Sequence, residues 1–140
     1  MDDCTRGCDA LDDATLAGRF EALQIAPGDF GHREHVRLAF AMLDGADFGD
    51  AAVRFRRALR SFANAVGADA KYHETLTWAY LSLVNERMQT AAFASSFELL
   101  AAHPDLLDHR NGALATLYDV AAITASPLAR RAFVLPRAES

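Results

Sequence analysis

In the stretch Phe30-Gly31-His32-Arg33-Glu34-His35-Val36-Arg37, two imidazoles stand three residues apart at the predicted start of a helix. The apolar positions that follow recur at helical spacing and, extended back by one turn, pass through both histidines. These positions are Leu38, Ala39, Met42 and Leu43. We expect the helix to begin near His32 and to end before Gly45, with both imidazoles on its apolar side.

A second stretch, Lys71-Tyr72-His73-Glu74-Thr75-Leu76-Thr77-Trp78, opens another predicted helix, which continues to about Thr90. His73 falls on its inward side, and Glu74 falls in the first turn, where the helix dipole favours a carboxylate. One further predicted helix lies between these two in the chain. Because short connections make neighbouring helices antiparallel, the helix before it and the helix after it begin at the same end of a bundle. We therefore expect His32, His35 and His73 to converge on a polar pocket.

Length and composition predict a single all-α domain. The chain has 140 residues, of which 51% are apolar, and Ala and Leu dominate over β-branched residues, which favours helices. We predict a compact bundle of four to five main helices plus a short C-terminal helix. The domain is expected over residues 13–136, with a flexible acidic leader over 1–12 and a tail over 137–140.

The other helices are predicted from caps and periodicity. We expect a first helix over about 14–25 capped by Asp12 or Asp13, and a third from Asp50, its N-cap, to Gly67. Two shorter helices are expected over 96–102 and 111–118, and a last one after Ser126-Pro127. The arginines of the third helix are expected on its solvated side, with Asp50–Arg54 as a pair one turn apart.

Charge and targeting signals limit the partners. The net charge is −5, which argues against nucleic acid or an anionic membrane as a partner. No apolar run is long enough to span a bilayer, and the N-terminus has no signal-peptide pattern, so we expect a cytoplasmic protein. Cys4 and Cys8 are expected to be incidental thiols of the leader. The apolar segment 120–123 would allow a homodimer without requiring one.

Two kinds of chemistry fit the histidines. Three imidazoles beside a glutamate match the ligands of a zinc, copper or non-haem iron site, with His32, His35 and His73 bound to the divalent metal. Acid–base chemistry without a metal fits as well. His35 or His73 would then move a proton while Glu74 orients or charges the imidazole, since a helix N-terminus biases an imidazole toward its neutral form.

A small-molecule ligand is the expected partner. The candidate contacts with it, besides the imidazoles, are Lys71, Tyr72, Thr77, Trp78 and Arg130. Arg130 and Arg131 would act as an anion clamp if the C-terminal arm folds over the pocket. Trp78 and Tyr80 could line the cavity, although aromatic residues at helical spacing are more often part of the core.

The interpretation that we favour is a small-molecule enzyme, of a biosynthetic kind, with a histidine-centred pocket. One alternative is a helical module that binds a metal or a small ligand without turning it over. Another is an interaction protein whose histidines are structural. For His103 and His109, which flank a predicted turn, we favour a structural role.

Four blocks carry a resemblance. Phe-x-His-x-x-His-x-Arg-x-Ala over 30–39 is followed by Lys-Tyr-His-Glu-Thr-Leu-Thr over 71–77, His-Pro-Asp-Leu-Leu over 103–107 and Ser-Pro-x-Ala-Arg over 126–130. In this order they resemble a family of small bacterial all-helical proteins that has no established activity. The similarity runs from about Phe30 to Pro136, and it implies nothing about the chemistry.

Overall fold

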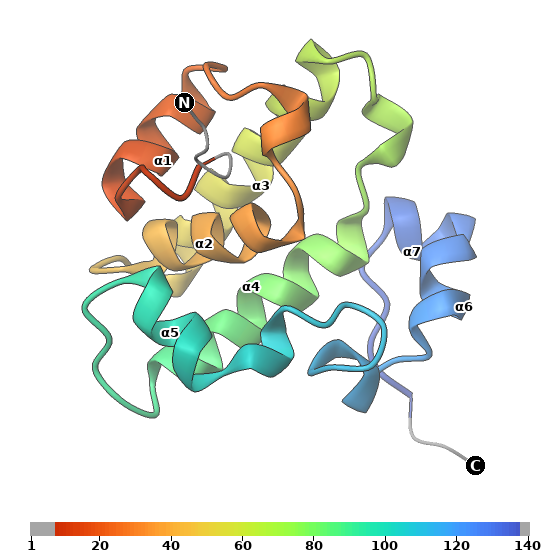
Figure 1. The fold of residues 1–140 in the computed structure, drawn as a ribbon. Helices are drawn as coiled ribbons and strands as arrows, with labels where there is room; N and C mark the ends of the chain where they lie inside the picture. The colour runs from red at the N-terminus through yellow and green to blue at the C-terminus, as the bar shows by residue number, and fades with distance from the viewer. Residues whose placement is uncertain (1–7, 138–140) are drawn as a thin grey trace.

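This computed structural model describes residues 8–137 of the chain (Figure 1). These residues form seven α-helices and four short 3-10 helices, joined by turns and loops. The α-helices are α1 (Asp13–Glu21), α2 (His32–Leu43), α3 (Phe48–Ala65), α4 (Glu74–Met88), α5 (Ser96–Ala102), α6 (Val120–Ala125) and α7 (Pro127–Arg131). The 3-10 helices are η1 (Pro27–Asp29), η2 (Asp69–Lys71), η3 (Pro104–Leu106) and η4 (Leu114–Thr116). No strand occurs within residues 8–137, so the predicted all-α class is confirmed.

Side-chain caps fix most helix beginnings. The carboxylate of Asp12 accepts from the backbone N–H of Thr15 at 2.8 Å, and Ser95 and Ser126 cap α5 and α7 in the same way. Such a cap satisfies an N–H that the helix itself leaves without a partner. At α3 the cap is Asp47 rather than the expected Asp50, so the helix begins at Phe48.

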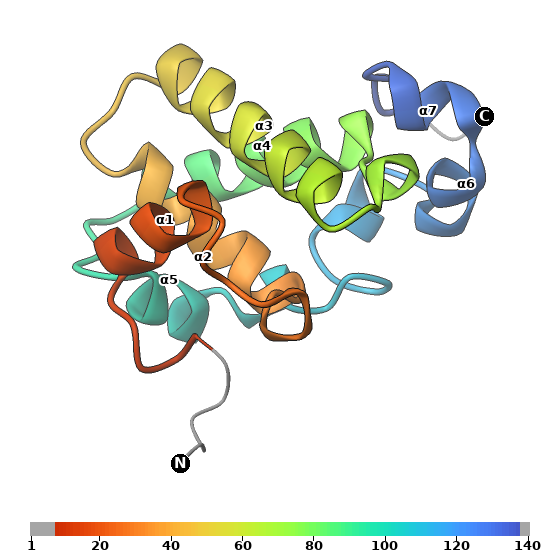
Figure 2. The same ribbon diagram turned by 90° about the horizontal axis from the view of Figure 1, so that it is seen from above.

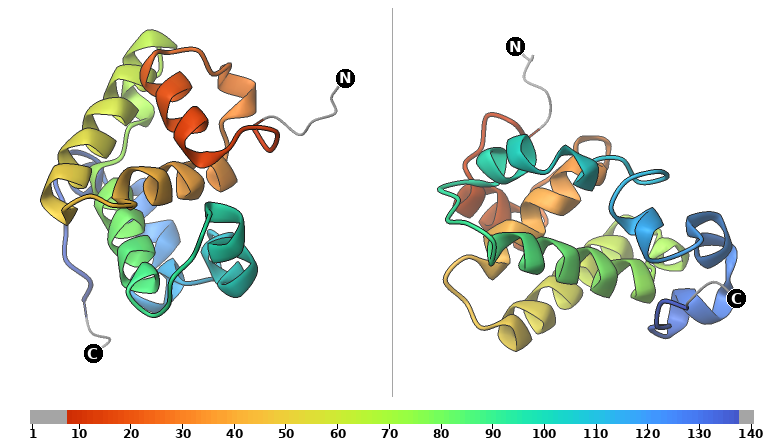
Figure 3. Two further views of the ribbon diagram at one scale, coloured as in Figure 1. Left: turned by 90° about the vertical axis from the view of Figure 1, so that its left-hand side faces the viewer. Right: turned by 90° about the horizontal axis from the view of Figure 1, so that it is seen from below.

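Helix α2 is the centre of the fold. Seven of its twelve residues are buried, and it contacts α1, α3, α4 and α5 (Figure 3). A helix that is covered on several sides must be apolar around most of its circumference. The run from Val36 to Phe40 meets this requirement except at Arg37, which is nevertheless fully buried.

Helices α2 and α4 begin on the same side of the molecule (Figures 1 and 2). Helix α3, which connects them in the chain, returns from the end of α2 to that side (Figure 1). The antiparallel order expected from the short connections is therefore present. Gly45 and Gly67, with φ of 73° and 70°, make the turns that follow α2 and α3. This left-handed conformation is open to glycine at little cost.

The C-terminal helices α6 and α7 lie beyond the start of α4 (Figure 3). Thr75, fully buried in the first turn of α4, joins them to the bundle. Its hydroxyl donates to the carbonyl of Ala129 at 2.8 Å and accepts from the backbone N–H of Val134 at 3.1 Å. The C-terminal segment is thereby fastened to the helix that carries His73.

The guanidinium of Arg37 ties the N-terminal segment to the bundle. It donates to the carbonyls of Cys8 and Leu11, at 2.8 and 2.6 Å, and forms an ion pair with Asp13. It also lies 4.2 Å from the ring centroid of Phe97 on α5. Residues 8–12 are therefore not part of a flexible leader as expected, because their carbonyl oxygens satisfy a buried cation. Cys4 and the rest of residues 1–7 lie outside the described residues.

Two further expectations were wrong. Residues 111–118 form only the short η4, because Asp108 draws the chain into a turn: its carbonyl accepts from the N–H of Gly112 at 3.0 Å. Arg54 pairs with Glu21 on α1, at 2.7 and 2.8 Å, and not with Asp50. Arg54, which was expected on the solvated side of α3, therefore forms a contact between α3 and α1.

None of the helices in the described part of the chain is both long enough and apolar enough to cross a membrane.

We expect Arg37→Met to lower the free energy of unfolding by about 3 to 5 kcal/mol, because it leaves the carbonyls of Cys8 and Leu11 without their donor and removes the cation that pairs with the partly buried carboxylate of Asp13. Urea denaturation monitored by circular dichroism measures the change. Arg57→Met, an exposed position on α3, is the control and should stay within about 0.5 kcal/mol of the parent. Equal effects of the two substitutions would contradict the role assigned to Arg37.

Candidate functional site

Three imidazoles and one phenol gather where α2 begins. His32 and His35 come from the first turn of α2, Tyr80 from α4 and His109 from the loop after η3. The ring centroid of Tyr80 lies 4.7 Å from that of His32, 5.8 Å from that of His109 and 6.4 Å from that of His35. We call these four residues the imidazole cluster.

His32 is fixed in one tautomer. Its Nε2 lies 2.8 Å from the carbonyl oxygen of Leu106, and because a carbonyl only accepts, Nε2 carries the proton. Burial lowers the pKa of His32, although the bond to Leu106 acts in the opposite direction. A neutral ring therefore links the end of η3 to the first turn of α2.

His109 is held by the hydroxyl of Tyr80, which lies 2.7 Å from its Nδ1. Burial lowers the pKa of His109, Arg110 lowers it further and Asp108 opposes both. Burial raises the pKa of Tyr80, so its hydroxyl keeps its proton. The opposite nitrogen of His109, Nε2, is the one that remains for a ligand.

The loop that carries His109 closes tightly on itself. The backbone N–H of Ala113 donates to the carbonyl of Asp105, and that of Gly112 to the carbonyl of Asp108, both at 3.0 Å. A β-carbon at residue 112 would collide with both of these carbonyl oxygens. Only glycine lets the backbone approach itself this closely, and His109 is positioned by that turn.

His35 has a buried nitrogen without a partner. Its Nε2 is shielded from solvent and makes no hydrogen bond with any described residue, while the ring centroid lies 5.4 Å from that of Phe55 and 5.9 Å from that of Phe30, with the rings tilted. Burial, reinforced by His32 and His109, lowers the pKa of His35 to about 3. The ring is neutral at physiological pH, and its orphaned nitrogen is an unsatisfied polar group in the cluster.

A pocket of about 640 Å³ opens beside the imidazole cluster. His109 lines it together with Arg110, Asp119 and Thr124, and residues of α6 supply apolar surface. Asp119 is also the N-cap of α6, accepting from the N–H of Ala122 at 3.1 Å. His109 is the member of the cluster that borders this pocket.

His73 does not join the imidazole cluster as a free base. Its Nδ1 accepts from the backbone N–H of Leu76 at 3.1 Å, and its Nε2 donates to the carbonyl of Ile123 at 2.8 Å. Both ring nitrogens are therefore occupied, and the residue, 6% exposed, is the N-cap of α4. Burial lowers its pKa, but it has no lone pair available for a proton or a metal.

Glu74 is likewise engaged. Its carboxylate accepts from Arg56, Tyr72 and the indole of Trp78 at 2.8 to 3.0 Å. Burial raises the pKa of Glu74, but these hydrogen bonds outweigh burial and hold the pKa below its usual value. Glu74 is thus an ion-pair partner that joins α3 to α4, instead of the expected base beside an imidazole.

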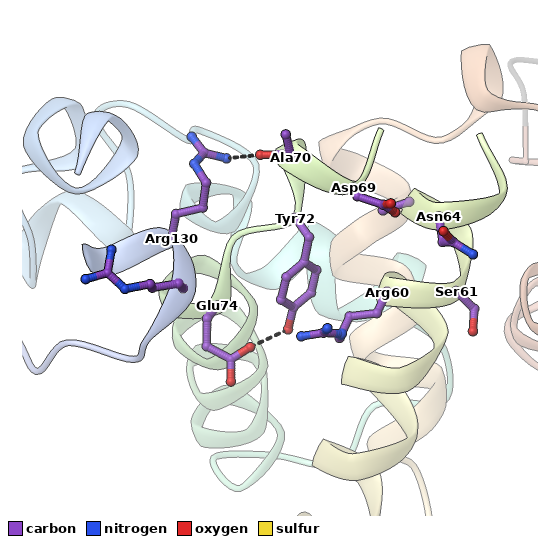
Figure 4. Close-up of a pocket in the computed structure, with 10 residues that line it drawn as sticks. Arg60, Ser61, Asn64, Asp69, Ala70, Tyr72, Glu74 and Arg130 are labelled. Carbon is purple, nitrogen blue, oxygen red and sulfur yellow. Dashed lines mark hydrogen bonds between the residues drawn. The ribbon is translucent and has the colours of Figure 1, made fainter. Parts of the chain in front are cut away.

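The expected ligand contacts fall into two groups. Tyr72 and Arg130 line a separate pocket of about 590 Å³, which Glu74 also borders (Figure 4). Thr77 is buried, and its hydroxyl donates to the carbonyl of His73 at 2.8 Å. Trp78 is bound to Glu74, and Lys71 is exposed on η2 outside the lining of either pocket. Thr77 is therefore not available to a ligand.

The predicted metal site is not formed. Among residues 8–137, no group of three or more His, Cys, Asp or Glu side chains is arranged to hold a metal ion. The helices that carry His32, His35 and His73 begin on the same side of the molecule (Figure 1). The ring nitrogens of His73, however, are hydrogen-bonded to Leu76 of α4 and Ile123 of α6. His73 is therefore not available as the third ligand of the predicted metal site.

From the sequence, a structural role is favoured for His109, and Tyr80 is named only as a residue that could line the cavity. Tyr80 could be placed on the inward side of its helix by periodicity, yet periodicity does not show that a hydroxyl meets an imidazole. His109 lies in a loop, where no periodicity applies. The one usable signal was the Asp108–Gly112 spacing, which is typical of a tight turn.

Comparison of the chain with protein-family models, with curated proteins and with solved structures gives no match. The resemblance carried by the blocks at 30–39, 71–77, 103–107 and 126–130 stays a prediction.

We expect His73→Ala to cost about 1 to 2 kcal/mol of unfolding free energy, because α4 loses its N-cap. His73→Asn, which keeps a side-chain acceptor at the cap, should restore part of that loss. Thermal and urea melts of the two variants measure the difference. If Ala and Asn are equally destabilising, His73 does not act as a cap.

His35 should make the protein less stable in acid. In the unfolded chain His35 binds a proton near its ordinary pKa of 6.5, whereas in the folded protein its pKa is about 3. Between these values the unfolded state binds more protons, so stability falls as the pH is lowered, by at most about 1.4 kcal/mol per pH unit. Urea melts at pH 7 and pH 5 should show a steeper loss in the parent than in His35→Phe. Parallel losses would show that His35 is not held neutral.

Proposed function

We propose that the protein is a small-molecule enzyme that uses His109 as its proton-transfer group and Tyr80 to orient that group. The observation that supports this most directly is the 2.7 Å hydrogen bond between Tyr80 Oη and His109 Nδ1, on a ring that lines a pocket of about 640 Å³. An imidazole that has one nitrogen fixed by a hydrogen bond and that borders a pocket has the arrangement of a general acid or base.

The tyrosine hydroxyl suits this role because it can both donate and accept. When Nε2 carries no proton, Nδ1 carries one and donates to the hydroxyl oxygen. When Nε2 takes up a proton the ring becomes a cation, and the same Nδ1–H still donates to that oxygen. The ring therefore keeps its orientation while Nε2 gains and loses a proton, and the raised pKa of Tyr80 keeps the hydroxyl neutral throughout.

The other imidazoles are less suited to move a proton. His73 has both nitrogens occupied, and burial lowers the pKa of His35 to about 3, too low for an efficient base near pH 7. His32 is held in one tautomer by Leu106. In the proposal His32 and His35 are neutral neighbours that place no fixed positive charge behind His109.

The pocket indicates the kind of substrate. Arg110 and Asp119 offer opposite charges on its wall, and Thr124 adds a hydroxyl, while the small residues of α6 leave apolar surface. We propose a small polar substrate in which one group is recognised by Arg110 and a proton near it is transferred by His109. A cytoplasmic location, predicted from the sequence, belongs to the same proposal.

A non-catalytic binding module would use the same pocket without proton transfer, so the experiment must separate the two. Imidazole signals in ¹H–¹⁵N spectra of the parent should shift at His109 when a fragment library of small polar compounds contains a ligand. A bound compound that is converted by the parent, but only bound by His109→Gln, supports the enzyme. Binding that leaves the His109 signals unchanged rules out this pocket.

Tyr80→Phe provides the conservative variant. It keeps the ring and removes the hydroxyl, so we expect a loss of turnover of about 10- to 100-fold with little change in ligand affinity, because the phenol orients His109 and does not hold the substrate. The rate should be followed against pH for parent and variant. A Tyr80→Phe variant with the parent's turnover and pH profile would show that the hydrogen bond has no part in the reaction.

A further inference from the structure

A second pocket, of about 590 Å³, lies between the end of α3, η2 and α7, and is lined by Arg60, Arg130 and Arg131 (Figure 4). We propose that it binds a small multivalent anion whose charged groups are phosphates or carboxylates. The three guanidinium groups come from two helices that are far apart in the sequence. We call this pocket the arginine pocket.

The guanidinium groups are not neutralised by the protein. Among residues 8–137, none of the three forms an ion pair with a carboxylate, whereas Arg37, Arg54, Arg56 and Arg87 all do. Each unpaired guanidinium keeps donors for an external carboxylate or phosphate, which it can bind in a bidentate manner. The chain as a whole has a net charge of −5, so these three arginines form a locally positive region on an acidic protein.

Two of the arginines are held in place before any ligand arrives. Arg130 donates to the carbonyls of Ala70 and Thr124, both at 3.0 Å, and these contacts leave its charge intact. The guanidinium of Arg60 lies 5.4 Å from the ring centroid of Tyr72. Fixing these long side chains in advance reduces the entropy that binding would otherwise cost.

The negative groups of the pocket are largely accounted for. Glu74 is bound by Arg56, Tyr72 and Trp78, so its charge is already balanced. The last carbonyls of α3 accept from the N–H groups of Gly67 and Ala68, which weakens the negative end of that helix. Asp69 also lines the pocket and lies across it from Glu74 (Figure 4), so the anionic groups of the ligand are expected at the guanidinium groups and away from Asp69.

The arginine pocket shares no lining residue with the pocket of His109. A failure of anion binding in the arginine pocket would therefore not contradict the proposed role of His109, and the converse also holds. The probes for this one are pyrophosphate and citrate, titrated against the full chain at constant ionic strength by isothermal titration calorimetry. Trp78, the single tryptophan, is bonded to Glu74 at 3.0 Å, so its fluorescence reports binding in this pocket.

We expect saturable binding of at least one probe, and the preferred probe tells whether phosphate or carboxylate is recognised. Arg60→Gln and Arg131→Gln, both at exposed positions, should each weaken binding about tenfold, as expected for a lost charge-assisted contact. Arg57→Gln, on the same helix but outside the pocket, changes the net charge equally and should bind like the parent. Absence of saturable heat with both anions, or equal weakening by Arg57→Gln, would overturn the proposal.

Discussion

One buried cation organises the N-terminal half of the molecule. Arg37 is fully buried in the middle of α2, and an unpaired charge there would cost several kcal/mol. Its donors must therefore be met, and they are met by Asp13, by Ser96 and by the carbonyls of residues 8 and 11. Through these bonds Arg37 links α1, α5 and the N-terminal segment to α2, while their apolar side chains pack into the same core.

The central position of α2 also determines the chemistry at its first turn. Because α4 and the loop after η3 cover that turn, the rings of His32 and His35 are partly shielded from water and their pKa values fall. His109, at the border of a pocket, keeps access to a ligand. Three imidazoles within one cluster thus differ in what they can do, because burial and hydrogen bonds differ among them.

The elements of the fold could largely be predicted, because caps and periodicity are local. The bounds 96–102 and the start at Pro127 follow from Ser95, Ser96 and Ser126 in the sequence alone. The site could be predicted only in part. His32 and His35 were placed on the inward face, but the partners of His73 and Glu74 come from α6 and α3. Such contacts between distant segments leave no periodic signal, and the same holds for Arg37.

The turn at Gly112 has a consequence for how this chain can change. The two carbonyl oxygens that crowd residue 112 leave no room for any side chain, and the same turn sets the position of His109. A replacement at residue 112 would force the loop open and carry the imidazole away from Tyr80. Lineages that share this loop are therefore expected to inherit the glycine and the histidine together, or to lose both.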